Sequence, residues 1–422
     1  MVIQIPRGTQ DILPGQSEKW QYVEQVARDL CRLYQYEEIR TPMFESTDLF
    51  VRGVGDTTDI VQKEMYTFPD KSDRSLTLRP EGTSPVVRSY IGNKMHGHVN
   101  QPVKLFYLAP VFRYERPGAG RYRQHHQFGA EVLGSEDPAV DAEMISLAVH
   151  FFETLGLKNL RVAVNSLGDT ESRMQYRQNL VAHFESRIGE FCSDCQRRLE
   201  QNPLRILDCK VDQKHELIAT APSILDHLNE YSADYFAKVQ QYLQAMGVEV
   251  VIDATLVRGL DYYNHTVFEV MFDSQGFGAN ATLSGGGRYN GLVEQLGGPP
   301  VSAVGFGLGL ERLLLALEAE GIQLPIEKTL DCYLVSFGEQ AKDETVKLLH
   351  QLRKAGFSCE RDYLDKKPKA QLKAADRLGA KYVIMIGDDE ITAGTVSVKN
   401  MQTTEQETVL VKDLVEFLKK GA

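Results

Sequence analysis

The sequence lacks a long hydrophobic run, since no apolar stretch approaches the roughly 20 residues that a membrane-spanning helix needs. Its first fifteen residues also lack the apolar core of a secretory signal. Cysteine is scarce, with six in 422 residues, which excludes a scaffold held by disulfides. Basic residues do not dominate, because the formal net charge is −11. We therefore expect a cytoplasmic protein that contacts no membrane and binds polyanions only through local basic patches.

Two nucleotide-binding patterns are missing as well. The chain has no G-x-x-x-x-G-K-[ST] segment, so any ATP that it binds is not held by a P-loop. Residues 303–309 (AVGFGLG) superficially resemble a dinucleotide-binding turn, but the third glycine comes one residue early. No alternating strand–helix pattern surrounds this segment, which argues against a nicotinamide enzyme.

The most informative stretch is 105–134, which reads LFYLAPVFRYERPGAGRYRQHHQFGAEVLG. Its pattern predicts two antiparallel strands joined by a long loop. The hairpin carries four arginines: Arg113, Arg116, Arg121 and Arg123. Guanidinium groups are planar, permanently charged and suited to clamping phosphates. With acids at Glu115 and Glu131, the hairpin predicts a site for a polyanion and a smaller polar ligand. A solvated charged hairpin is the alternative.

The rest of the first 325 residues predicts a mixed domain. Apolar residues at three- and four-residue steps indicate helices over 17–36 and 138–154. Residues 170–245 are charged and helical in pattern, which indicates a helical insertion. Strands are expected at 38–42, 248–257, 267–272 and 281–283, and residues 303–309 are expected to open a helix over 310–320. We expect an antiparallel core sheet flanked by helices.

The insertion contains a cysteine pattern. Cys192 and Cys195 form a C-x-x-C, and Cys209 and His215 follow. Such a set can bind zinc, but the second pair has irregular spacing in a polar region. Ordinary reduced thiols are the preferred interpretation, so we predict no metal site.

Beyond a linker at 325–329, residues 330–422 alternate strands and helices and predict a separate small α/β domain. Its second helix, 368–378, lies in a basic patch made of Lys366, Lys367, Lys369, Lys373, Arg377 and Lys381. An RNA-binding face requires such a patch, and a solvated helix face is the alternative.

Side chains that suit a nucleotide and an amino acid recur along the first domain. Arg113, Arg258 and Arg312 are placed to surround a triphosphate from three sides. Donors and acceptors for a small zwitterion come from Glu81, Thr83, Gln127, Glu131 and Tyr263. Thr83 has a second interpretation, as the N-cap of a helix that follows it. Because nothing resembles a Ser-His-Asp triad, we expect attack at phosphorus helped by positioning and charge neutralisation.

Six motifs make the chain resemble the histidyl-tRNA synthetases, a family of class II aminoacyl-tRNA synthetases, nearly end to end. EIRTPMFE, FRYERPGAGRYRQ and GFGLGLERL resemble class II motifs 1, 2 and 3. LVRGLDYY and SGGGRYNGL resemble the two histidine-specific signatures, and LRPEGT supports the same subgroup. The resemblance implies an α+β fold, with a class II catalytic domain at 1–325 that holds the helical insertion (about 170–245). It also implies an anticodon-binding domain at 330–422, and a homodimer formed through motif 1.

The resemblance further implies histidine activation by ATP, with Mg²⁺, and transfer of histidine to its tRNA. Arg113 and Arg258 would act on the α-phosphate, Arg258 in a place where related synthetases use a metal ion. The ATP-binding residues would be Arg113, Glu115, His125, Arg258 and Arg312. The histidine-binding residues would be Glu81, Gly82, Thr83, Gln127, Glu131, Tyr262 and Tyr263. The tRNA acceptor end would meet Arg116, Arg121 and Arg123.

Two positions depart from the family pattern. His125 stands where phenylalanine usually stacks on adenine, so we expect altered packing of ATP. Asn290 stands where the second signature usually has an acid, which removes one charge. The rival interpretation is a catalytically inactive, histidine-sensing paralogue such as the regulatory subunit of ATP phosphoribosyltransferase. Such proteins generally lose the anticodon domain and the signature arginines, and this chain keeps both.

Overall fold

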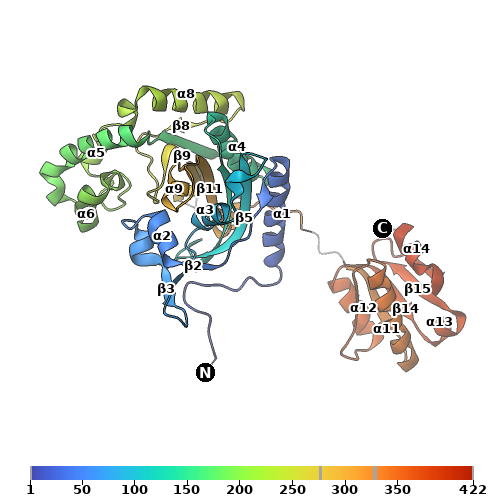
Figure 1. Cartoon of the computed structure of the whole chain (residues 1–422). Coiled ribbons are helices and arrows are strands. Elements are labelled where there is room, and N and C mark those ends of the chain that lie inside the picture. The colour runs from blue at the N-terminus through green and yellow to red at the C-terminus, as the bar shows by residue number, and fades with distance from the viewer. Residues whose placement is uncertain (1, 275–277, 327–329, 421–422) are drawn as a thin grey trace. The chain divides into compact units, whose positions relative to one another are not determined.

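The computed structural model describes residues 2–274, 278–326 and 330–420, so residues 327–329 of the expected linker lie outside it. The chain divides into two compact units, the first ending at Leu324 and the second beginning at Pro325 (Figure 1). No helix in these described ranges combines the length and the apolarity that crossing a bilayer requires. Each unit has its own sheet and its own core.

An eight-stranded sheet organises the first unit, in the order β1-β5-β6-β11-β10-β9-β7-β8. The strands are β1 (Glu37–Glu38), β5 (Val103–Phe112), β6 (Gln124–Leu133), β7 (Leu160–Ser166), β8 (Val251–Ile252), β9 (Asn264–Ser274), β10 (Gly278–Arg288) and β11 (Ala303–Gly309). The six inner strands are antiparallel, but β1 and β8 pair in parallel at the two edges. The predicted antiparallel core sheet is confirmed for these inner strands, and the strands expected at 38–42 and 248–257 are reduced to two residues each.

Alternation along the strands gives the sheet two apolar faces. Phe106 and Phe128 belong to one core, and their chain neighbours Leu105 and Tyr107 belong to the other. The first face is covered by α1 (Ser17–Leu33), α4 (Pro138–Thr154), α8 (Glu230–Ala245) and α10 (Leu310–Ala319). The second is covered by α3 (Thr83–Gly92), α9 (Leu292–Gln295) and the part of the insertion that precedes α8 (Figure 1).

The insertion follows β7 and is helical throughout its described residues, as its sequence pattern predicts. Its elements are α5 (Thr170–Phe184), η3 (Glu185–Glu190), α6 (Ser193–Gln201), η4 (Pro203–Ile206), α7 (Glu216–Ala219), η5 (Ile224–His227) and α8. A small sheet of β2 (Phe44–Ser46), β3 (Tyr66–Pro69) and β4 (Ser75–Leu78) lies in the N-terminal part, with α2 (Thr47–Val54), η1 (Ile60–Glu64) and, after α3, η2 (Met95–Gly97).

A buried ion pair joins the sheet to α4. Arg288, at the end of β10, pairs with Asp141, and both side chains are fully buried. Tyr235 donates a further hydrogen bond to Asp141 at 2.8 Å. Asn290 accepts a hydrogen bond from the Ala303 backbone N–H at 3.0 Å, so it ties the end of β10 to β11. The glycine-rich segment 284–287 is part of β10, and the buried charge at its end is stable because it is paired.

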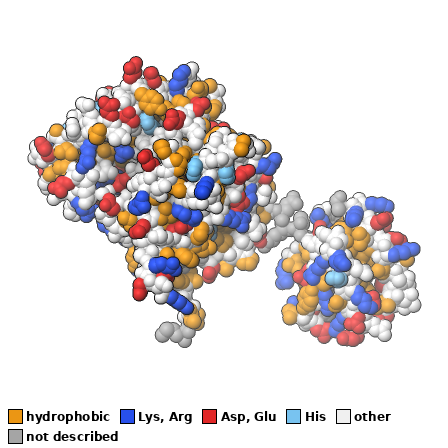
Figure 2. Space-filling model, viewed as in Figure 1, with side chains coloured by type: hydrophobic (Ala, Val, Ile, Leu, Met, Phe, Trp, Pro, Cys, Tyr) orange, Lys and Arg blue, Asp and Glu red, His pale blue; other side chains and the backbone are white. Residues whose placement is uncertain are grey.

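The second unit is a five-stranded sheet, in the order β13-β12-β14-β15-β16. Its strands are β12 (Leu330–Ser336), β13 (Cys359–Arg361), β14 (Ala380–Ile386), β15 (Thr395–Asn400) and β16 (Gln406–Leu410). Its helices are α11 (Glu339–Lys354), α12 (Pro368–Arg377), α13 (Asp388–Ala393), η6 (Val411–Asp413) and α14 (Leu414–Lys420). Figure 2 shows basic and acidic side chains interspersed on the visible face of each unit, as the moderate net charge implies.

Candidate active site

A cavity of about 390 Å³ opens in the first unit, above the strands β6, β10 and β11. Eleven of the predicted site residues line it: Glu81, Thr83, Arg113, Glu115, Arg121, His125, Gln127, Arg258, Tyr262, Tyr263 and Arg312. Four do not, namely Gly82, Arg116, Arg123 and Glu131. The three arginines expected around a triphosphate therefore share one cavity with the acids and phenols expected around an amino acid.

Glu81 is held at the start of α3. Its carboxylate accepts hydrogen bonds from the backbone N–H groups of Thr83 at 2.6 Å and Ser84 at 2.9 Å. These are donors of the first helical turn, which favours a negative charge. The helix does begin at Thr83, but Glu81 supplies the capping group instead of the threonine hydroxyl. The buried carboxylate is thereby fixed in position before any ligand arrives.

Glu131 is fully buried next to this end of the cavity. It accepts hydrogen bonds from the hydroxyls of Thr83 at 2.8 Å and Tyr289 at 2.6 Å. Burial raises the pKa of Glu131 to about 8, against the opposing effect of these two hydrogen bonds. Thr83 lines the cavity, so its hydroxyl connects the buried Glu131 to the cavity. Tyr289 was not predicted as a site residue.

Glycines on the strands make room for these side chains. A Cβ atom on Gly305 would lie 1.7 Å from a carboxylate oxygen of Glu131. A Cβ atom on Gly285 would lie 2.3 Å from Nη2 of Arg258. The glycine-rich signatures in β10 and β11 thus provide the space in which a buried carboxylate and a guanidinium lie.

Arg113 and Arg258 are oriented by fixed partners. Arg113 donates from Nε to the Pro80 carbonyl at 2.7 Å, and its Nη1 lies 3.9 Å from Glu115. Arg258 forms an ion pair with Glu269, which also accepts a hydrogen bond from Thr282 at 2.8 Å. The Nε of Arg258 is buried and has no hydrogen-bond partner among the described residues. An unpaired buried donor is costly, so this group favours an added acceptor such as a phosphate oxygen.

Arg312 and Arg121 add further positive charge. Arg312 is in the first turn of α10, and the hairpin loop passes over it at Gly120. Burial, and then the neighbouring Arg121, lower the pKa of Arg312. Two cations held this close destabilise each other, and an anion between them relieves the repulsion. This end of the cavity therefore suits a polyphosphate.

His125 lies on β6, where it lines the cavity with these arginines. Burial, and then the charge of Arg113, lower its pKa to about 3, so the imidazole is neutral at pH 7. A neutral ring can stack on a flat ligand without adding charge. Its neighbour His126 is used differently, because its Nδ1 lies 3.0 Å from Glu311 and its backbone N–H donates to the same carboxylate at 2.9 Å.

The three loop arginines differ in their freedom. Arg116 and Arg121 are exposed to solvent. Arg123 instead stacks on the ring of Tyr114, 3.7 Å from its centroid, and donates to the Glu115 carbonyl at 3.3 Å. Arg123 therefore holds the hairpin together, while Arg116 and Arg121 are available to an outside ligand.

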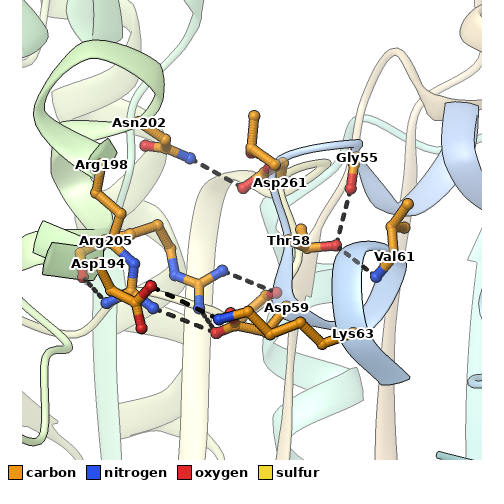
Figure 3. A network of polar contacts seen from close by, with 12 residues as sticks. Gly55, Thr58, Asp59, Val61, Lys63, Asp194, Arg198, Asn202, Arg205 and Asp261 are labelled. Atoms are coloured by element: carbon orange, nitrogen blue, oxygen red, sulfur yellow. Dashed lines mark hydrogen bonds and ion pairs between the residues drawn. The ribbon is translucent and has the colours of Figure 1, made fainter. Parts of the chain in front are cut away.

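Sequence reasoning missed Arg205, which reaches the cavity from the insertion. It donates to the Gly259 carbonyl at 3.1 Å, beside Arg258. Arg198 pairs with Asp59 at 3.2 Å, and Asn202 donates to Asp261 at 2.9 Å (Figure 3). Arg205 of η4 thus lines the site, and α6 supports the segment that carries Asp59. A polar helical segment gives no signal of this role, because its partners lie more than fifty residues away in the chain.

Comparisons with known proteins show which family the chain belongs to. A family model described as histidyl-tRNA synthetase matches residues 8–313, and an anticodon-binding domain model matches residues 331–421. The histidine–tRNA ligase of Geobacillus thermodenitrificans (strain NG80-2) is 64% identical over 418 residues, which are 99% of this chain and 98% of that protein. That of Bacillus cytotoxicus (strain DSM 22905 / CIP 110041 / 391-98 / NVH 391-98) is 62% identical over 418 residues, 99% of each chain.

Solved structures show the same relationship. The apo histidyl-tRNA synthetase of S. aureus superposes with a TM-score of 0.86 at 52% identity, covering 99% of this chain and 100% of that one. An ATP phosphoribosyltransferase regulatory subunit/histidyl-tRNA synthetase from Bacillus halodurans shares the fold at 21% identity, with a TM-score of 0.64 over 92% of this chain and 99% of that one. The predicted resemblance and α+β fold class are confirmed, and the chain belongs to the histidyl-tRNA synthetase family.

Proposed function

We propose that this protein is a histidine–tRNA ligase. It activates L-histidine with ATP to histidyl-adenylate and pyrophosphate, and then transfers histidine to the 3′-terminal ribose of a histidine tRNA. The observation that carries this proposal is the single cavity, which joins acids and phenols at one end to Arg113, Arg258 and Arg312 at the other. The full-length relatives named histidine–tRNA ligase support the same function.

Histidine binds at the acidic end. Glu81 receives the amino group, and Gln127 and Thr83 assist it. Tyr263, with Tyr262 beside it, bonds to one imidazole nitrogen, and the other nitrogen faces Thr83, whose hydroxyl donates to Glu131 behind it. A neutral imidazole is both donor and acceptor, so a phenol paired with a hydroxyl that a carboxyl group supports selects it over apolar side chains of similar size. Gly82 leaves room for the Tyr107 ring, because a Cβ atom at Gly82 would lie 2.2 Å from that ring.

ATP binds at the cationic end, with adenine on His125 and Arg312 and with the phosphates among the arginines. A carboxylate oxygen of histidine attacks the α-phosphorus, and the bond from that phosphorus to the bridging oxygen of the β-phosphate breaks. Arg113 and Arg258 neutralise the charge that develops on the α-phosphate, as preorganised cations do in a site from which water is partly excluded. The reaction depends on positioning, since no covalent enzyme intermediate is needed.

Magnesium enters as part of the ATP substrate. The carboxylates of Glu115 and Glu64 line the cavity, and oxygen donors of this kind suit Mg²⁺. They are the residues that would hold the ion against the phosphates, where it supplies charge neutralisation.

In the second step a hydroxyl of the terminal ribose attacks the histidyl carbonyl carbon, and AMP leaves. Arg116 and Arg121 of the hairpin loop guide the acceptor end, with Arg123 supporting the loop. We assign catalysis to residues 1–325 and anticodon binding to residues 330–422. The exposed basic helix α12 supplies positive charge for the RNA.

We further propose a homodimer that works in the cytoplasm, where its tRNA and ATP are found. The motif 1 region leaves Leu33, Met43 and Phe44 more than half exposed. Apolar side chains gathered in this way suit an interface. Equilibrium sedimentation tests the dimer, and a monomer at micromolar concentration would contradict it.

The rival is a histidine-sensing paralogue without catalysis. Histidine-dependent exchange of radiolabelled pyrophosphate into ATP separates the two, because only adenylate formation produces exchange. We expect exchange with histidine and none with phenylalanine. Its absence in protein that still binds histidine would refute the ligase.

A further inference from the structure

Four ligand-type side chains meet in the insertion, away from the cavity. They are Cys192, Cys195, Cys209 and Asp212, whose sulfur and oxygen atoms all lie within 4.8 Å of one another. The Sγ atoms of Cys192 and Cys209 are 3.7 Å apart, and Cys209 Sγ lies 3.4 Å from Asp212. Cys195 and Cys209 are buried, and all three thiols are free.

These distances fit a tetrahedral metal site. Zinc binds thiolate sulfur at about 2.3 Å and carboxylate oxygen at about 2.0–2.2 Å. In a tetrahedron the sulfur atoms are then about 3.8 Å apart, close to the observed separation. A disulfide needs sulfur atoms about 2.05 Å apart, so the Cys192–Cys209 pair is not one.

The local fold brings these four side chains together from two short segments. Cys192 precedes α6 and Cys195 lies in its first turn, so the C-x-x-C presents both sulfurs at the start of a helix. Cys209 follows η4, and Asp212 accepts a hydrogen bond from the Cys192 backbone N–H at 3.1 Å. Two segments separated by a turn thus converge on one point.

The sequence pattern suggested His215 as the fourth member, and the structure places it elsewhere. Its Nε2 lies 3.1 Å from Glu190, and its Nδ1 accepts from the Leu217 backbone N–H at 3.2 Å. The irregular spacing that argued against a metal site was the spacing of a set that included His215, which does not join the cluster. Asp212, only three residues after Cys209, completes the set.

We propose that Cys192, Cys195, Cys209 and Asp212 form a structural Zn²⁺ site. Three sulfurs and one carboxylate oxygen close the coordination sphere, which is typical of structural and not of catalytic zinc. Within α6, Cys195 is the one fully buried residue. The helix therefore has little apolar anchorage, and a metal supplies the missing constraint.

The site has a consequence for the cavity, because α6 and η4 carry Arg198, Asn202 and Arg205. Arg198 contacts Asp59 and Asn202 contacts Asp261 (Figure 3). Arg205 donates to the Gly259 carbonyl, and Asp59, Arg205 and Gly259 line the cavity. Zinc would fix this part of the cavity, and its loss would free Arg205 beside the substrate. The metal thus supports the active site without touching the reactants.

The first test measures metal directly and needs no activity. Protein expressed with zinc supplementation is analysed by mass spectrometry of its metals, and the chelated protein is refilled with Co²⁺. We expect one zinc per chain, and visible d–d bands with ultraviolet thiolate-to-cobalt charge transfer after refilling. Cys192→Ser should lose both signals. Cys31→Ser, which removes another buried thiol far along the chain, should keep them.

Several results would overturn the proposal. These are a wild-type chain that holds no stoichiometric zinc and gives no cobalt bands, a Cys192→Ser variant that keeps its zinc, or a Cys192–Cys209 disulfide in the native protein. If Cys192→Ser does not fold, Asp212→Asn and the chelated wild type replace it. Chelation should lower the melting temperature by several degrees and increase protease cleavage within residues 190–215, and zinc should restore both. Unchanged melting and cleavage would equally contradict a structural metal.

Discussion

The two units handle positive charge in opposite ways. In the cavity of the first unit, Arg113 and Arg258 are partly buried and fixed by a carbonyl group and by acids. In the second unit, Lys367 at the N-cap of α12 and Lys369 and Lys373 on the helix are exposed, and no ion pair joins them to any other described residue. Burying a charge costs desolvation free energy unless the charge is paired, so the pairing partners fix its geometry in advance. Exposed charges stay solvated, and they act together through the electric field that they sum to.

This contrast separates residues that would act on the reacting groups from residues that would attract the RNA. A fixed cation can stabilise one charge in a transition state, and a mobile set of lysines can hold an extended polyanion such as RNA. Substitutions in the cavity should therefore abolish adenylate formation with or without tRNA. Substitutions on α12 should change only the steps that involve tRNA.

The largest effect should come from Arg258→Ala. We expect histidine-dependent pyrophosphate exchange to fall by a factor of about 10²–10³ or more, since a preorganised cation at the α-phosphate is removed. Histidine binding, followed by calorimetry, should stay measurable. Arg74→Ala, at a surface arginine that pairs with Asp70, should exchange normally. Near-normal exchange by Arg258→Ala would remove this residue from the mechanism.

The loss of Arg258 leaves Glu269 without its partner, which could lower activity through misfolding. The double variant Arg258→Ala/Glu269→Gln removes both charges and controls for this effect. If it melts like the wild type and still lacks exchange, the defect is chemical. Recovery of exchange in the double variant would instead show that Arg258 serves mainly to neutralise Glu269.

The next effect concerns Glu131, whose pKa is about 8 in the folded protein. An unfolded glutamate ionises near pH 4.5, so between these values the folded state holds a proton that the unfolded state has released. Stability should therefore fall as the pH rises from 4.5 to 8, by at most about 1.4 kcal/mol per pH unit from this group. Glu131→Gln should remove that contribution and flatten the curve. Urea unfolding at pH 5 to 9 measures it, and parallel curves would be inconsistent with the buried acid.

Exposed charge in the second unit should give a smaller and more selective effect. Lys367→Ala/Lys373→Ala should raise the KM for tRNA several-fold and leave pyrophosphate exchange unchanged. Losing two phosphate contacts should reduce the slope of log affinity against log salt by about 1.5. The matched control Lys412→Ala/Lys419→Ala removes the same charge outside α12. Equal losses in both double variants would show that net charge, not the α12 surface, attracts the RNA.

Residues that lie in continuous motifs and line the cavity are easier to predict from the sequence than residues that support them from other parts of the chain. The arginine hairpin, Glu81 and the glycine-rich strands all stand in continuous motifs, so their elements and their meeting in one cavity were predictable. Tyr289 and Arg205 were not. Each acts through a partner more than fifty residues away, Glu131 and Gly259, and no local pattern records such a contact.

Errors in the sheet have the same origin. The edge strands β1 and β8 pair in parallel because of where the chain returns after helices, which local alternation does not encode. The glycines of 284–287 are tolerated in β10 because side chains from elsewhere occupy the space that a Cβ atom would need.

The smallest effect should come from His125→Phe, which restores the residue that is usual in the family. Phenylalanine presents a larger apolar face to adenine, and aromatic packing contributes about 0.5–1.5 kcal/mol. We expect the KM for ATP in the exchange assay to fall by about two- to tenfold, with the KM for histidine unchanged. An unchanged or higher KM for ATP would mean that the adenine does not rest on this ring.

The same variant tests whether the cavity wall holds a neutral imidazole. The folded pKa of His125 is about 3, below its ordinary value near 6.5. As the pH falls below 6.5, the unfolded state takes up a proton that the folded state refuses, so the wild type should lose stability toward acid. His125→Phe has no such proton to bind and should keep more of its stability between pH 6.5 and 4. If both proteins lose stability alike, the ring is free to protonate, and this part of the cavity is as solvated as the lysines of α12.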